Sequence, residues 1–312
     1  MKKPALLVIG LLLLAFISIY FIIPQNISAE SVVHIDATDR NVAKFVVLKS
    51  SWKKWWPGEK TANDSINYSY KNVKYSLLKS SNGDIQIKIK KGNDTLSSKI
   101  NYLATGEGET DVAWTATQLS STNPFTRIAQ YTKIKAIQTD MAEVLATFKK
   151  FMQIDENVYG LKVAIKKVTQ HYYLTTSINT TAYPATETVY KLLNDLQKQV
   201  TAKGAKTTGN PILNVNQTDD RAFSVMVALP VNKNFAADVN TKINEMVVGA
   251  NLLQTQVTGG RQTIANAFTQ LKLYQKDHVL TSPAMPFESL ITNRLAEKDT
   301  AKWVTTIYYP IF

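Results

Sequence analysis

The sequence predicts an α+β protein with two folded domains behind an apolar N-terminal helix, on the strength of three observations. The chain has 312 residues, which is long for a single domain. From residue 65 to about 131 it reads as successive alternating strands joined by short turns, and an amphipathic helix follows. From residue 159 onward strands and helices alternate instead, in an order that repeats. We therefore expect an anchor over 1–25 and domains over 31–157 and 159–312.

The composition excludes several kinds of site. Hydrophobic residues make up 45% of the chain and charged residues 19%, which is typical of globular proteins. There is no cysteine, and the three histidines do not lie at metal-ligand spacing, so we expect no metal and no cofactor. The net charge of +12 comes from scattered lysines without a nucleic-acid-binding motif. We expect no nucleic-acid partner, and a basic surface that favours a nearby anionic membrane.

The N-terminus has the pattern of a membrane anchor. An apolar run covers Ala5–Ile23, about the length that crosses a hydrocarbon core as a helix. Lys2 and Lys3 precede it, and the first charges after it are acidic, which predicts a body outside the cytoplasm, on the periplasmic side. Ile27–Ala29 is a passable cleavage site, so a removed signal peptide is the alternative. We favour a retained single-pass anchor.

The first domain is predicted to be a curved sheet closed by a helix. A strand at Ser31–Ile35 leads into a capped helix, and three tryptophans lie within Trp52–Gly58. After the meander, a Thr139/Asp140 cap predicts the start of the amphipathic helix, with apolar side chains along one side through Met152.

This order, with Val33–Thr38 and Trp52–Gly58, resembles the helix-grip family, the SRPBCC or START-like group that includes polyketide cyclases. The resemblance implies a cavity between sheet and helix for a lipid or another hydrophobic molecule. Trp114 and Arg127, which we place on the meander, are the candidates to line it. The alternative is that these residues and the tryptophans pack the core.

The second domain is predicted to contain an internal repeat. Each half reads as strand, helix, strand, strand, and the second half begins at Asn251–Val257. Pro283–Glu288 corresponds to the strand at Asn210–Val215, and Thr305–Ile311 corresponds to Ser224–Val231. Two such halves are expected to pair their helices on one face of a sheet and to leave a groove on the other face.

The repeat, Val257–Gly260, Pro286–Glu288 and Ile307–Ile311 resemble the GyrI-like bacterial effector-binding family. The resemblance implies that Glu288 lies in the groove and contacts a cationic, aromatic ligand. Trp303, Tyr308 and Tyr309 are the aromatic candidates beside it, and strand parity leaves open which tyrosine faces the groove. No DNA-binding segment precedes the domain, and the charged loop at 292–302 is longer than the resemblance leads us to expect.

The function expected from these features is small-molecule binding at the membrane. The first domain would take a hydrophobic ligand and the second a cationic aromatic one. One alternative is a hydrolase of small electrophilic compounds, in which Glu288 activates water beside Trp303 or a tyrosine. Another is a structural envelope protein without a ligand, which filled cavities would favour.

Overall fold

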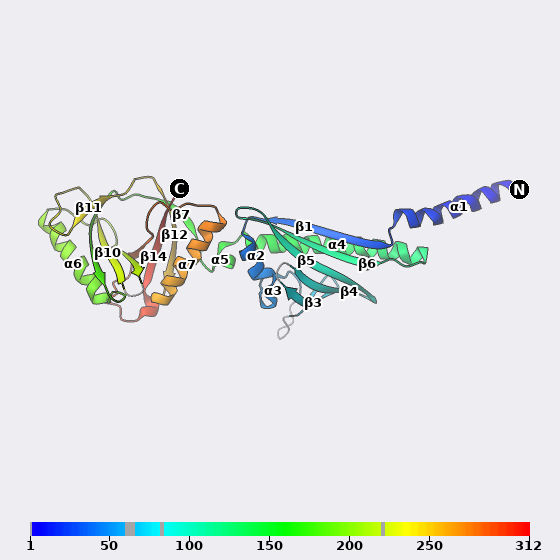
Figure 1. Cartoon of the computed structure of the whole chain (residues 1–312), viewed down its shortest axis with the longest axis horizontal. Helices are drawn as coiled ribbons and strands as arrows, with labels where there is room; N and C mark the ends of the chain where they lie inside the picture. The colour runs from blue at the N-terminus through cyan, green and yellow to red at the C-terminus, as the bar shows by residue number, and fades with distance from the viewer. Residues whose placement is uncertain (1, 60–65, 82–83, 220–221) are drawn as a thin grey trace. The chain divides into compact units, whose positions relative to one another are not determined.

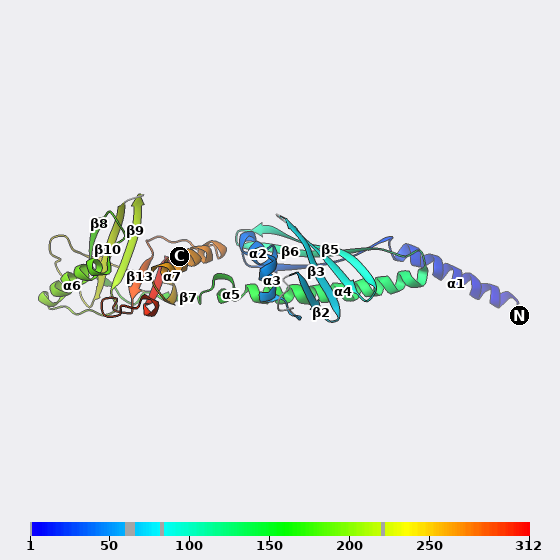
Figure 2. The ribbon, with the colours of Figure 1, turned by 90° about the horizontal axis from the view of Figure 1, so that it is seen from below.

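The computed structural model describes residues 2–59, 66–81, 84–219 and 222–312, with the backbone alone for residues 2–7 and Ser81. The chain divides into two compact units, Met1–Ile154 and Asp155–Phe312, shown as ribbons in Figures 1 and 2. Helix α1 (Lys2–Ile22) begins the first unit. Within the part of the chain that is described, no helix combines the length and the apolarity of a membrane span. The anchor stays a prediction from the sequence.

The first unit contains an antiparallel sheet in the order β1-β6-β5-β4-β3-β2. Its strands are β1 (Asn26–Ile35), β2 (Asn67–Tyr70), β3 (Val73–Ser81), β4 (Asp84–Lys91), β5 (Asp94–Gly106) and β6 (Glu109–Leu119). The helices that follow α1 are α2 (Asp39–Val46), α3 (Lys49–Trp55) and α4 (Pro124–Met152). Helix α4 runs along the sheet in Figure 2.

Helix α4 begins fifteen or more residues before the predicted Thr139/Asp140 cap, so that prediction was wrong. The Asn123 side chain accepts hydrogen bonds from the amides of Phe125 and Thr126, and Pro124 occupies the first turn. An asparagine cap followed by proline is a strong start signal, because proline needs no amide partner in the first turn. Arg127 consequently lies on this helix and not on the meander.

The second unit contains an eight-stranded sheet in the order β11-β8-β10-β9-β13-β14-β12-β7. Its strands are β7 (Ala164–Lys167), β8 (Tyr172–Thr180), β9 (Ile212–Asp219), β10 (Ala222–Val231), β11 (Lys242–Glu245), β12 (Asn251–Thr258), β13 (Phe287–Leu290) and β14 (Val304–Ile311). Its helices are α5 (Asp155–Tyr159), α6 (Thr186–Ala202), α7 (Arg261–Asp277) and the short 3-10 helix η1 (Thr300–Lys302).

The predicted repeat is confirmed in the order of these elements. The first half is β8, α6, β9 and β10, and the second half is β12, α7, β13 and β14. In the sheet the halves run β8-β10-β9 and β13-β14-β12, so they are mirrored about the β9–β13 junction. There Glu288 pairs with Leu213 and Ser289 with Ile212. The middle of the repeat therefore places Glu288 at the centre of the sheet.

Both long helices of this unit cover the same face of the sheet. Helix α6 packs its apolar side on Leu213, Leu290 and neighbouring residues, and α7 packs on Leu253, Ile307 and neighbouring residues. The opposite face carries a separate apolar cluster without a helix, whose members include Tyr173, Phe287 and Tyr308. Alternation along the strands therefore decides whether a side chain faces the helices or the other side.

Candidate functional site: a buried carboxylate beside an aromatic pocket

Glu288 points to the face of the sheet that the helices cover. Its neighbour Leu290, two residues on, packs against α6, whereas Phe287 and Ser289 point to the opposite side. The Glu288 residue is only 4% exposed. A carboxylate buried to this degree is costly unless a cation or hydrogen-bond donors compensate it.

Arg294 supplies the compensating charge. Its Nη2 atom lies 2.7 Å from Glu288 Oε2 and 2.8 Å from Thr305 Oγ1, and the arginine is 8% exposed. The guanidinium also lies over the Trp303 ring, 4.9 Å from its centroid. Carboxylate and aromatic face are the two features that sequence analysis assigned to a cationic ligand. In the structure, the cation they hold is the side chain of Arg294.

The ion pair leaves capacity for a further interaction. Burial raises the pKa of Glu288, while the adjacent Arg294 charge and its hydrogen bond oppose that rise. Arg294 donates to Oε2, and among the described residues no hydrogen bond is made to the other carboxylate oxygen, Oε1. Because Glu288 lines a pocket, this oxygen is the acceptor that a bound molecule would meet.

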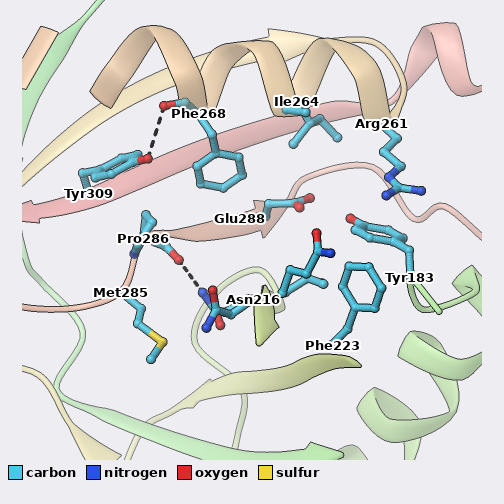
Figure 3. Close-up of a pocket in the computed structure, with 14 residues that line it drawn as sticks. Tyr183, Asn216, Phe223, Arg261, Ile264, Phe268, Met285, Pro286, Glu288 and Tyr309 are labelled. Atoms are coloured by element: carbon cyan, nitrogen blue, oxygen red, sulfur yellow. Dashed lines mark hydrogen bonds between the residues drawn. The ribbon is translucent and has the colours of Figure 1, made fainter. Parts of the chain in front are cut away.

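The pocket has a volume of about 430 Å³ and lies between α7 and the sheet. Figure 3 shows Glu288 at its centre, with Phe268 and Tyr309 on one side and Tyr183 and Arg261 on the other. The lining residues are Tyr183, Asn214, Val215, Asn216, Gln217, Phe223, Arg261, Ile264, Ala265, Phe268, Met285, Pro286, Glu288 and Tyr309. Aromatic walls with a few polar groups are typical of small-molecule sites.

The two ends of the pocket differ in polarity. At one end the Tyr309 hydroxyl donates to the backbone oxygen of Phe268 at 3.2 Å, which leaves its ring as a wall. At the other end the Arg261 guanidinium lies 3.7 Å from the centroid of the Tyr183 ring. The Tyr183 hydroxyl points toward the Glu288 carboxylate in Figure 3. Burial raises the pKa of Tyr183, so this hydroxyl stays protonated at neutral pH.

A second cavity of about 230 Å³ borders the first near the starts of α6 and α7. Tyr183, Arg261 and Ile264 line both cavities, and Arg294 and Trp303 line the second one. Arg294 therefore lies behind Glu288 as seen from the larger pocket.

Strand parity separates the two candidate tyrosines. Tyr309 lines the pocket with Glu288, whereas Tyr308 points to the opposite face and packs on Phe287 with 5.3 Å between ring centroids. A hollow of about 390 Å³ on that face is lined by Tyr308, Tyr173 and Leu252 among others. The groove was expected on the face without helices, but side chains of α7 line the Glu288 pocket. A hollow does lie on the face without helices, but Glu288 does not line it. The expectation that Glu288 lies in that groove was wrong, because Glu288 shares its parity with Leu290 and faces the helices.

Neither candidate of the first unit is among the residues that line the hollow beside Ser98 and Thr115 in this unit. Trp114 is fully buried, its ring contacts Tyr75 and Trp56, and its Nε1 atom donates to Ser98 Oγ. Arg127 donates to the backbone oxygen of Ile23 and lies over the Tyr20 ring. Their role in binding a hydrophobic ligand stays a prediction.

Sequence reasoning did not identify several pocket residues. Tyr183 lies in the loop before α6, Phe223 on β10, and Phe268 was expected only as a core residue of its helix. Arg294 falls in the charged loop that stood out by its length, six residues after Glu288. An arginine six residues after a carboxylate that was expected to be buried is the sequence signal that could have identified the ion-pair partner of Glu288.

No group of metal-ligating side chains occurs among the described residues.

No family model matches the sequence, and no curated protein does. Among solved structures, the C-terminal domain of EcmrR is 17% identical, covers 49% of this chain and 98% of its own, and has a TM-score of 0.42. A hydrolase from Listeria innocua is 11% identical, with 48% and 92% covered and a TM-score of 0.37. SAV2435, solved with bound tetraphenylphosphonium, is 10% identical, with 49% and 94% covered and a TM-score of 0.33. At these values the similarities assign neither a family nor a ligand to this chain.

Proposed function

We propose that the second unit binds a small aromatic molecule in the pocket that Glu288 and Tyr309 line. The observation that carries the proposal is the buried carboxylate at the centre of an aromatic pocket, with one oxygen free of described partners. If the ion pair only stabilised the fold, apolar side chains would do the same, because they often replace buried ion pairs without loss of stability. A charged pair beside an open pocket is therefore better explained by recognition.

The pocket can be tested by filling it. Ala265 lines the pocket at an exposed position of α7, so Ala265→Trp should occupy the space without disturbing the core. Asn266→Trp, at an exposed position outside the lining, is the matched control. Aromatic fragments are titrated into the full-length chain by calorimetry. We expect binding to wild type and Asn266→Trp and a loss of roughly tenfold or more with Ala265→Trp. Equal affinity for all three proteins would place the site elsewhere.

A cationic ligand, the class expected from the sequence, meets an obstacle at this site. Arg294 already holds Glu288 and Trp303, so a ligand cation has to share the carboxylate or displace the arginine. Displacement would leave a buried guanidinium without its partner, which is costly. The proposed ligand is therefore aromatic, and a cationic group on it is disfavoured beside the ion pair of Arg294 and Glu288.

A hydrolase is the second candidate, because the pKa of Glu288 is raised and the Tyr183 hydroxyl points toward it. A carboxylate with a raised pKa is suited to accept a proton from water. Glu288→Gln should then abolish turnover of an activated aromatic epoxide while binding persists. If binding and turnover are both unchanged, Glu288 has no catalytic role.

Placement at a membrane is proposed from the sequence alone. The apolar run Ala5–Ile23 behind Lys2 and Lys3 supports an anchored chain with its body outside the cytoplasm. Protease added to intact spheroplasts should then digest the body. Protection until the cells are lysed would overturn this topology.

For the first unit, a hydrophobic ligand likewise rests on the sequence, and lipid co-purifying with the full chain in native mass spectrometry would support it.

A further inference from the structure

The charge of the pocket differs from what a lone glutamate suggests. Among the described residues that line it, the charged ones are Glu288 and Arg261. Arg294, behind the pocket, balances Glu288 at 2.7 Å. The positive charge of Arg261 is therefore left over at one end.

Arg261 has the features of a cation held ready for an anion. It is exposed, it lies on the Tyr183 ring, and no ion pair of the described residues includes it. The Tyr183 ring fixes the guanidinium at the pocket edge, since arginine stacks well on aromatic faces. A guanidinium presents paired donors that match a carboxylate or a phosphate.

The local backbone adds to the positive potential. Arg261 is the first residue of α7, and the first turn of this helix contains no acidic residue. The residue before it, Gly260, has no side chain that caps the helix. The positive end of the helix dipole thus coincides with an arginine, which is unfavourable unless an anion is present.

We propose, on the basis of the proposed function, that the ligand of this pocket is an aromatic anion. Its carboxylate, or a comparable acidic group, binds Arg261 beside Tyr183, and its ring packs among Phe268, Phe223 and Tyr309. A hydrogen-bond donor on the same molecule meets Glu288 Oε1. A lipophilic cation is disfavoured, because Arg294 already neutralises the carboxylate that would attract it.

Three probes that share one ring system test this charge preference. Naphthoate, naphthylmethanol and naphthylmethylammonium differ in charge but carry the same aromatic body. Calorimetric titration of the full-length chain should give the tightest binding for naphthoate and the weakest for the ammonium. Raising the salt concentration should lower the affinity for naphthoate alone, because salt screens the contact between its carboxylate and an exposed arginine.

Two variants and one charge control identify the residues responsible for this preference. Arg261→Gln should lower the affinity for naphthoate roughly fivefold to tenfold and leave the affinity for naphthylmethanol unchanged. Lys272→Gln removes an equal charge from an exposed position of α7 outside the pocket and should change none of the three. Arg294→Met frees the charge of Glu288 and should reverse the order, so that the ammonium binds most tightly. If Arg294→Met fails to fold, the wild type and Arg261→Gln still decide.

Each outcome has a distinct meaning. A preference for naphthoate that Arg261→Gln removes supports the inference. Alcohol or ammonium binding as tightly as naphthoate overturns it but leaves the proposed aromatic site intact. Absence of binding by all three probes, in a chain that is folded by circular dichroism, counts against both the inference and the proposed function.

Discussion

The ion pair of Glu288 and Arg294 decides the character of the site at the scale of single residues. Sequence reasoning expected Glu288 beside aromatic rings that include Trp303. In the structure the Trp303 ring lies under the Arg294 guanidinium, and Arg294 in turn binds Glu288. It had no means to predict that the chain itself provides the cation. Loop conformation determines whether a charged side chain six residues away folds back or extends into solvent, and local pattern does not encode this.

Arg294→Met is expected to destabilise the second unit by roughly 3–5 kcal/mol at neutral pH, because it leaves Glu288 buried without a partner. The penalty should shrink as the pH falls. Burial already raises the pKa of Glu288, and removal of Arg294 takes away the charge that opposes that rise. A carboxyl with a raised folded-state pKa binds protons more readily in the folded chain than in the unfolded chain. The destabilisation that its charge causes is therefore full above the folded-state pKa and disappears below the ordinary glutamate pKa.

Urea denaturation at pH 7.5 and pH 5 measures this effect for wild type and variant. The double variant Glu288→Leu/Arg294→Leu is the control, since it removes both charges and should recover most of the lost stability. A penalty for Arg294→Met that is the same at both pH values would mean that Glu288 is not the group responsible.

Trp114 tests whether the core of the first unit is closed. Its ring lies among Trp56 and Tyr75, and the residue has no exposed surface. Trp114→Ala should cost roughly 3–5 kcal/mol, as expected for deletion of a buried ring. Leu119→Ala, at a residue that is 69% exposed on the same strand, should change stability little. A small loss for Trp114→Ala would instead indicate a pre-existing cavity, and would favour a hydrophobic ligand there.

At the scale of elements, the sequence predicted the order of helices and strands within the two repeats, whereas α5 and β11 of the second unit were not predicted. Alternating patterns and turn residues are local, and they placed both repeats. The pairing of β9 with β13 and the side on which the helices lie are long-range properties, which follow from packing. The sequence therefore left open whether Tyr308 or Tyr309 faces the pocket, and in the structure Tyr309 lines it.

The start of α4 shows a local signal that was present but not used. Asn123 and Pro124 mark the first turn, yet apolar periodicity is weak over the following residues because several of them face solvent. The stronger apolar stripe after Thr139 drew the predicted boundary toward the C-terminus. Capping residues were the better guide here, because capping depends on the backbone ends and not on which face is buried.

Asn123→Ala should destabilise the first unit by about 1 kcal/mol, because two backbone amides lose their side-chain acceptor. Thr38 precedes α2 in the equivalent position but makes no capping hydrogen bond, so Thr38→Ala is the matched comparison and should cost less. Both are measured by urea denaturation of the full-length chain. A larger loss for Thr38→Ala than for Asn123→Ala would show that the Asn123 cap contributes little.

At the scale of the whole molecule, the chain divides between Ile154 and Asp155 into two units with separate cores. Helix α5 belongs to the second of them. Tyr159 on α5 donates to Asp277 Oδ2 at 2.5 Å and packs on Tyr274 with 5.2 Å between ring centroids. Burial, with this hydrogen bond, raises the pKa of Tyr159, so its hydroxyl remains a donor across the physiological range.

Residues 155–312 are expected to fold alone and to bind aromatic probes as tightly as the full-length chain does. All residues that line the Glu288 pocket lie within this range. A fragment of residues 162–312, which lacks α5 and Tyr159, is the matched control. It should unfold at a lower temperature, because it leaves the apolar side of α7 near Tyr274 uncovered and Asp277 without its phenol donor. Calorimetric scans and probe titrations of both fragments measure this. If residues 155–312 fold but bind at least tenfold more weakly than the full-length chain, the first unit contributes to the site, and a ligand-binding role confined to the second unit is wrong.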